Sequence, residues 1–344
     1  MKEFTKEESK ILKGIAIIFM VCLHLYNRYD YMDGFYKPLL FIKGQPLIFL
    51  LSFICDACVP IYCFCAGYAA YLKKSSGGGS NLKRLLNLLK VYWVIVILTC
   101  ILGLIFNNES IPKNIITFLG NISLIKITYV GAWWFIQIYF LLMLTSKYII
   151  KLIDKNKPFF ILVISICIYF IAYYFRMIHV VHFDNVILEI IRNAVVLYGT
   201  SVLSFVVGML FYKYKLITLI RTNIKNHQSI IGGIIILLAI LIHIVIKSMI
   251  IAPFTAYIFI VGFSLLHIEG IIKKVLLFFG THSTNIWLVH MQFYSIFFKN
   301  VVFSTNTVIG CLVILLIMCI VTSYFINFII NSINSFINWV TSNM

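Results

Sequence analysis

The amino-acid sequence predicts an all-α, polytopic membrane protein that folds as a single membrane-embedded domain over residues 1–344. Hydrophobic residues make up 62% of the chain and charged residues only 11%, and the mean hydropathy is +1.02. Soluble domains carry about 25% charged residues, so this composition excludes an ordinary soluble globule. Apolar runs near the roughly 20 residues that a helix needs to cross a bilayer recur along nearly the whole chain.

In chain order, the apolar runs predict about ten transmembrane helices. The first run has the charged start and apolar middle of a signal peptide, but "LHLYNRYD" offers no small-residue cleavage site, so we expect it to remain as the first helix. The predicted spans cover residues 12–28, 46–72, 88–106, 132–150, 158–175, 187–212, 229–247, 250–268, 282–299 and 305–332.

Lysine and arginine predict how the helices are oriented, because positively charged loops are retained in the cytoplasm. With both termini cytoplasmic, the inner segments hold nineteen of the 28 basic residues and the outer segments eight, with Arg192 inside a span. The inner residues lie in the N-terminal segment and in 73–90, 147–157, 213–225 and 273–274. The net charge of +17 is thus explained by topology and by anionic lipids, and it does not indicate a nucleic-acid partner.

One cytoplasmic loop has an unusual composition. The stretch "LKKSSGGGSNLKRLLNLLKVYW" at 72–93 is a flexible glycine-serine linker followed by a basic approach to the third helix. Spacings of six and seven residues return Lys83, Arg84 and Lys90 to neighbouring faces of the helix. These residues are either a positive anchor at the membrane surface or a clamp for an anion, and this segment alone leaves both interpretations open.

The first predicted helix, "ILKGIAIIFMVCLHLYNRYD" at 11–30, carries two ionisable residues in an apolar run, Lys13 and His24. Eleven residues at about 100° each leave the two side chains only about 20° apart around the helix and separated by about 16 Å along it. A cation at the membrane edge with an imidazole deeper on the same face suits a ligand with an anionic head and a reactive tail. A snorkelling lysine with a packed histidine is the alternative interpretation.

Other polar residues also fall inside predicted spans, where they are expensive and often functional. Asp56 lies in the cluster "CDACVPIYCFC", for which we expect no metal because no second CxxC pair or nearby histidine follows outside the membrane. Glu189 and Arg192 are three residues apart and can pair on one helix face, either as a functional pair or as a contact between helices. Further polar points inside the spans are Gln137, His243, Asn285 and His290.

Several segments together resemble the acyltransferase 3 family of integral membrane acyltransferases. The opening "KGIAIIFMVCLH" is similar to the family's first-helix pattern, with Lys13 where arginine is usual. The segments "VPIYCFCAGYAAYL", "KRLLNLLKVYW", "AWWFIQIYFLL", "LSFVVGMLFYK" and "FFGTHSTNIWLVH" follow in the family's order. The departures are Ala66 for a common serine, Lys90 for arginine, and Ile136 and Gln137 where many members carry a glutamate.

The resemblance implies transfer of an acyl group, usually acetyl from cytosolic acetyl-CoA, to a hydroxyl of a cell-envelope glycan, such as a polysaccharide, or a lipid-linked sugar. It implies that His24 is catalytic and that Lys13, Lys83, Arg84 and Lys90 contact the phosphates of CoA. Candidates for the interior or the acceptor side are Asp30, Asp56, Trp134, Tyr139, Glu189, Arg192, Ser283 and His290.

The expected partners are acyl-CoA, the sugar acceptor and membrane lipids, and the expected location is the cell membrane. Because the chain ends soon after its last predicted span, the resemblance is expected to cover the membrane module only. A polytopic transporter or polysaccharide-export component is the alternative function, since it would also place polar residues inside about ten spans. Such a protein often has inverted repeats with helices broken at matching places, and the sequence has no such pattern.

Overall fold

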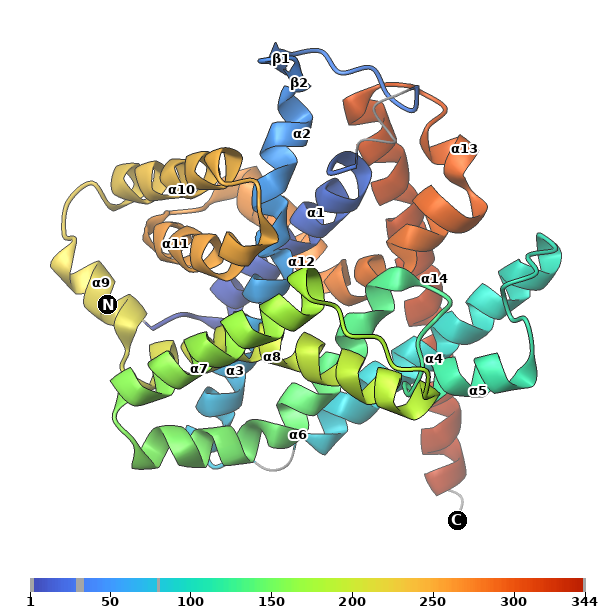
Figure 1. The fold of residues 1–344 in the computed structure, drawn as a ribbon, viewed down its shortest axis with the longest axis horizontal. Coiled ribbons are helices and arrows are strands. Elements are labelled where there is room, and N and C mark those ends of the chain that lie inside the picture. The colour runs from blue at the N-terminus through green and yellow to red at the C-terminus, as the bar shows by residue number, and fades with distance from the viewer. Residues whose placement is uncertain (1–2, 29–33, 79–80, 343–344) are drawn as a thin grey trace. The chain divides into compact units, whose positions relative to one another are not determined.

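The computed structural model describes residues 3–28, 34–78 and 81–342, and the structural statements below concern these residues. They are almost entirely helical, with one short hairpin of β1 (Phe41–Ile42) and β2 (Gln45–Pro46), as Figure 1 shows. The all-α prediction is therefore confirmed. Eight helices in this part of the chain are long and apolar enough to cross a membrane. The protein is thus a multi-pass membrane protein.

The eight long helices overlap eight of the predicted spans. In one of them a 3₁₀ turn joins two α-helices, in another a 3₁₀ turn precedes the α-helix, and a third ends in a π-helical turn. They are α1 (Lys6–Tyr26), α2 (Leu47–Ser52) with η2 (Phe53–Ala57) and α3 (Cys58–Ser75), α4 (Leu82–Ile105), η3 (Gly131–Trp133) with α6 (Trp134–Lys155), α7 (Pro158–Tyr173) with η4 (Tyr174–Ile178), α8 (Val186–Lys213), α10 (Gln228–Val245) and α14 (Val308–Ser342). The starts of α1 and α4 lie six residues earlier than predicted, and α14 ends ten residues later.

The other two predicted spans form helices of different extent. The span 250–268 is the shorter η5 (Met249–Ile251) with α11 (Ala252–Leu265). The span 282–299 belongs to α12 (Gly270–Met291) and the π-helical η6 (Gln292–Phe297), so the predicted start at 282 is wrong. The helix extends beyond the apolar run, and Lys273 near its start binds the carboxylate of Glu7 at 2.6 Å. The remaining helices are α5 (Ile115–Ile122), α9 (Leu216–Asn223) and α13 (Lys299–Val302).

The chain divides into two compact units, which are described separately. Unit 1 comprises Met1–Asn27, Leu40–Gly79 and Gln137–Thr281, and unit 2 comprises Arg28–Leu39, Ser80–Ile136 and His282–Met344.

The first helix of unit 1 begins at a well-formed cap. The Thr5 hydroxyl accepts from the Glu8 amide at 3.0 Å, and the Glu8 carboxylate accepts from the Thr5 amide at 2.7 Å. This capping box gives hydrogen-bond partners to two amides that have none within the helix. The negative carboxylates of Glu7 and Glu8 also interact favourably with the positive end of the helix dipole. Helix α1 then runs unbroken to Tyr26, which fixes the rotational relation of the side chains along it.

Two glycines hold α3 against α8 in the core of unit 1. A Cβ atom at Gly67 would collide with the Phe205 carbonyl of α8, and a Cβ atom at Gly208 would collide with the Phe64 carbonyl of α3. The two backbones therefore approach more closely than side chains would allow, as small residues permit in membrane helices. Helix α10 packs along α11 in the same unit (Figure 1).

Ion pairs gather charged residues from several connections of unit 1. The carboxylate of Asp154 at the end of α6 forms an ion pair with Lys74, and its Oδ1 atom lies 3.5 Å from the Lys213 ammonium. Arg221 of α9 pairs with Glu8 at 2.5 Å. Lys273 pairs with Glu7 as well. Together these ion pairs join the N-terminal segment and four connections that the sequence assigned to one side of the membrane. The contacts agree with that assignment, because side chains must lie on the same side to pair.

Reciprocal tryptophan hydrogen bonds organise unit 2. The Trp133 indole donates to the Leu288 carbonyl at 2.8 Å, and the Trp287 indole donates to the Ala132 carbonyl at 3.0 Å. Both indoles are largely buried, so each N–H needs a partner inside the protein. These bonds fix the segment before α6 against the second half of α12.

Candidate functional site

Helix α1 carries the predicted catalytic residue His24 and the predicted phosphate contact Lys13, both in unit 1. Lys13 and His24 are half-buried, whereas their neighbours Leu12 and Leu25 have no exposed surface. Because the helix is continuous, the two side chains keep the separation of about 20° and about 16 Å that an ideal helix gives. The predicted shared face is thus supported, and His24 lies in the last turn of the helix.

The glycine that follows Lys13 has a packing function. A Cβ atom at Gly14 would collide with the Leu276 carbonyl of α12, and a Cβ atom at Gly280 would collide with the Lys10 carbonyl of α1. The Tyr62 hydroxyl of α3 donates to the Lys13 carbonyl at 3.3 Å. Two elements therefore hold the backbone on either side of Lys13, so the position of its side chain is set by the crossing of α1 with α12 and by α3.

The predicted anion clamp of α4 lies in unit 2. Lys83 and Arg84 are exposed in the first turn of the helix. Lys90 is half-buried, and its ammonium donates to the Asn334 side-chain oxygen of α14 at 3.3 Å. The structure thus keeps two of these cations on the surface and engages the third with a neighbouring helix.

Asp56 acquires a partner that the sequence did not predict. Its side chain is buried in η2, and one carboxylate oxygen lies 3.9 Å from the Nε2 atom of His243 in α10. The Nδ1 atom of His243 lies 3.0 Å from the Thr255 hydroxyl, whereas Nε2 has no hydrogen-bond partner among the described residues. A distance of 3.9 Å is too long for a direct hydrogen bond. Asp56 and His243 therefore form a loosely engaged polar pair in the interior of unit 1. Asp30, the other aspartate of the prediction, lies outside the described residues.

The predicted pairing of Glu189 with Arg192 is confirmed. A terminal guanidinium nitrogen of Arg192 donates to Glu189 Oε1 at 2.6 Å within α8. The other Glu189 oxygen accepts from the Phe183 amide at 3.2 Å. The pair joins residues of one helix and of the segment just before it, so it does not connect two transmembrane helices.

The aromatic candidates at the start of α6 have different surroundings. Trp134 and Tyr139 are both half-buried, in unit 2 and unit 1 respectively. The neighbouring Trp133 is fully buried and bonded to α12, a role that the sequence analysis missed. The doublet of tryptophans was visible in the sequence, but its spacing alone does not tell which ring faces inward.

The candidates of α12 are inside unit 2. Ser283 is buried, and the completely buried His290 directs Nδ1 at the Trp287 carbonyl of its own helix at 2.7 Å. A carbonyl oxygen only accepts, so this nitrogen carries a proton. The sequence analysis also missed His282, whose Nδ1 lies 2.8 Å from the Ser323 hydroxyl of α14. Asn285 donates to the same hydroxyl at 2.8 Å, so these residues connect two helices.

Comparisons with known proteins add one match. The family described as an acyltransferase domain matches residues 7–327, which is nearly the whole chain. Searches among curated proteins and among solved structures found no match. The matched region includes α1 with Lys13 and His24, the basic start of α4, and α12 with Ser283 and His290.

Proposed function

Because the chain belongs to the acyltransferase 3 family and is therefore a membrane acyltransferase, we propose that it transfers an acyl group from cytosolic acyl-CoA to a hydroxyl of a cell-envelope glycan or lipid-linked sugar. The acyl group is acetyl in this proposal, and the site of action is the cell membrane. The family assignment favours this reaction over the transporter that the sequence also allowed.

The observation that carries the proposal is the arrangement of α1. His24 and Lys13 are partly accessible, whereas Leu12, Gly14 and Leu25 beside them are buried. In the proposed reaction the His24 imidazole, acting as a base, takes the proton of the sugar hydroxyl as its oxygen attacks the thioester carbonyl. The carbon–sulfur bond breaks, and the proton passes to the departing CoA thiolate. Transfer through an acylated imidazole is the other route open to the same residue.

The CoA phosphates need cations on the side where CoA is made. We assign this role to the basic residues that the resemblance implies, Lys13, Lys83, Arg84 and Lys90. Lysine binds phosphate as a point charge and lacks the two parallel donors of arginine, so Lys13 and Lys90 favour weaker binding than arginine would give at these positions. Within α1 the separation of about 16 Å leaves the anionic part of the donor at Lys13 and its thioester towards His24.

The test is acetyl transfer by the purified protein, with and without His24→Ala. With labelled acetyl-CoA and cell glycans as acceptors, we expect the variant to lose at least about 10²-fold in turnover, the usual contribution of a general base. His267→Ala is the matched control, since that imidazole is exposed and lies in a connection between helices.

Size-exclusion elution and thermal unfolding of both variants must match those of the parent protein. Turnover that survives His24→Ala in a folded protein would contradict the proposed role. Activity that falls only in proportion to the folded protein would mean that His24 is a packing residue.

A further inference from the structure

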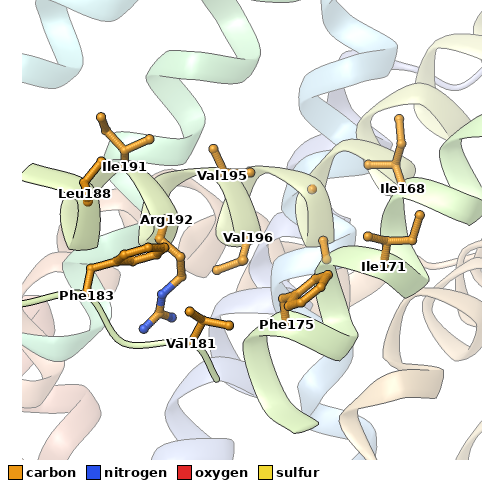
Figure 2. A pocket seen from close by; sticks show the side chains of 12 residues that line it. Ile168, Ile171, Phe175, Val181, Phe183, Leu188, Ile191, Arg192, Val195 and Val196 are labelled. Atoms are coloured by element: carbon orange, nitrogen blue, oxygen red, sulfur yellow. The ribbon is translucent and has the colours of Figure 1, made fainter. Parts of the chain in front are cut away.

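A groove opens between α7, the connection after it, and α8. Its volume is about 510 Å³, within the range of roughly 300–1,000 Å³ that is common for ligand sites. Figure 2 shows its wall, built from aliphatic and aromatic side chains such as Phe175, Phe183 and Val195. Arg192 is the one charged residue among those that line it. All of these elements belong to unit 1.

Arg192 has unused hydrogen-bonding capacity in this groove. Its side chain is only 14% exposed, and one terminal nitrogen binds Glu189. Its Nε atom is buried and has no hydrogen-bond partner among the described residues. A guanidinium group has five N–H donors, and those of the terminal nitrogens that do not bind Glu189 remain available for an acceptor that the described protein atoms do not supply. A cation with unpaired donors in an apolar wall indicates a ligand that brings oxygen atoms.

Arg192 lies off-centre in the α8 wall of the groove, four residues from its Leu188 end and seven from its Gly199 end. Arg192 is the seventh residue of α8, about 9 Å from the start of that helix. The apolar wall continues inward along the same helix to Gly199, about 10 Å further, and is completed by α7. A charge near the end of a transmembrane helix lies at the depth of lipid headgroups, with hydrocarbon beyond it. The groove thus fits an amphiphile whose chain points into the membrane.

Glu189 is not among the lining residues, but its contact with Arg192 places a carboxylate beside the groove, which bears on the headgroup that fits best. Its carboxylate is 28% exposed and lies 2.6 Å from the Arg192 guanidinium, so the two side chains form a neutral pair. A headgroup with net negative charge would meet the carboxylate as well as the guanidinium. A phosphate linked to an ammonium offers one charge to each partner, and a primary ammonium also donates hydrogen bonds.

We propose that this groove binds a phospholipid with a primary-ammonium headgroup, such as phosphatidylethanolamine. The phosphate accepts from Arg192, the ammonium lies beside Glu189, and one acyl chain lies along Val195 and Val196 against Ile168 of α7. The proposal does not depend on acyl transfer, and its test uses no acyl donor.

The test measures lipid retention by native mass spectrometry of the full-length protein in detergent. The probes are phosphatidylethanolamine, phosphatidylcholine and phosphatidylglycerol with identical acyl chains. Phosphatidylethanolamine should be retained best, because phosphatidylcholine cannot donate from its ammonium and phosphatidylglycerol has none. Arg192→Gln should weaken its retention about tenfold, since hydrogen bonds from a charged donor are lost.

A second variant tests the groove without removing a charge. Val195→Trp fills the groove from a position that is 63% exposed, so the fold should tolerate it, and retention should fall. Val163→Trp on α7 is the matched control, since this exposed residue does not line the groove. Equal retention in Val195→Trp and Val163→Trp would overturn the proposal. Phosphatidylglycerol retained as well as phosphatidylethanolamine would overturn the assigned headgroup.

Discussion

Lys13 and Gly14 are adjacent residues with separate functions. Gly14 allows α1 to meet the Leu276 carbonyl of α12, whereas the Lys13 side chain remains partly accessible beside this crossing. The glycine contact and the hydrogen bond from the Tyr62 hydroxyl to the Lys13 carbonyl both hold the backbone at this place. Substitution of Lys13 therefore changes the charge and leaves these two backbone contacts in place.

This separation allows a direct test of the proposed CoA contacts. Changing Lys13, Lys83, Arg84 or Lys90 singly to glutamine should raise KM for acyl-CoA more than it lowers kcat, because phosphate contacts far from the thioester supply uniform binding. Lys13→Arg should preserve or tighten binding, since the forked donors of arginine match phosphate oxygens. Steady-state kinetics over a range of acyl-CoA concentrations measures both effects.

The control for these substitutions is Lys151→Gln with Lys155→Gln. Both lysines are exposed on α6, in a segment assigned to the same leaflet, and the described residues provide no ion pair for either. If this double variant raises KM as much as a substitution of Lys13, the effect is one of surface potential. A marked loss of binding in Lys13→Arg would exclude Lys13 as a phosphate contact.

Contacts within one helix were predictable from the sequence, whereas contacts between distant residues were not. Glu189 and Arg192 were predicted to pair because three residues of helix bring side chains together, and they do so at 2.6 Å. Asp56 and His243 are far apart in sequence, so their approach depends on how η2, α10 and α11 pack. No local period in a sequence contains that information.

Among the elements, α3 and α8 are joined by the reciprocal contacts of Gly67 and Gly208. The apolar length of each helix was sufficient to predict its existence, but it did not predict which helix would be its neighbour. The glycines were visible in the sequence as parts of motifs, and the structure gives their physical reason. The start of α12 is not predictable from hydropathy, because Lys273 and Lys274 precede the apolar run and a helix that extends beyond such a run can carry charge.

The glycine contacts predict a stability difference between two Gly→Ala substitutions. Gly208→Ala should destabilise the protein by about 1–3 kcal/mol, since its methyl group meets the fixed carbonyl of Phe64. Gly233→Ala on α10 has open space at the same position and should be neutral or stabilising by up to about 1 kcal/mol, the helix-propensity gain. Thermal unfolding in one detergent compares them. Equal melting temperatures would contradict the close approach of α3 and α8.

For the whole molecule, the described ion pairs bear on the predicted topology. Asp154, Lys74 and Lys213 come from three connections that the basic-residue count assigned to one side, and Arg221 and Lys273 bind Glu8 and Glu7 of the N-terminal segment. These contacts agree with one shared side for those connections. That this side is the cytoplasm stays a prediction from charge.

Reporter fusions test the predicted side. A reporter fused after Met344 should be active in the cytoplasm, and one fused at Gly34 should be active outside. Both fusions leave the transmembrane helices intact, so they report the orientation of the native chain. A cytoplasmic signal at Gly34 would overturn the whole assignment of loops, including the side on which acyl-CoA is proposed to bind.

The reciprocal glycines of α3 and α8 also limit how unit 1 can move. A helix that slides by one residue advances about 1.5 Å and turns by about 100°, which would drive the Phe64 or Phe205 carbonyl out of its glycine notch and into a side chain. Sliding is thus blocked in both directions, and the two helices are held in a fixed register. Any hinge or shear movement of unit 1 must therefore displace α3 and α8 together. The backbone angles that change in such a movement lie in the other elements.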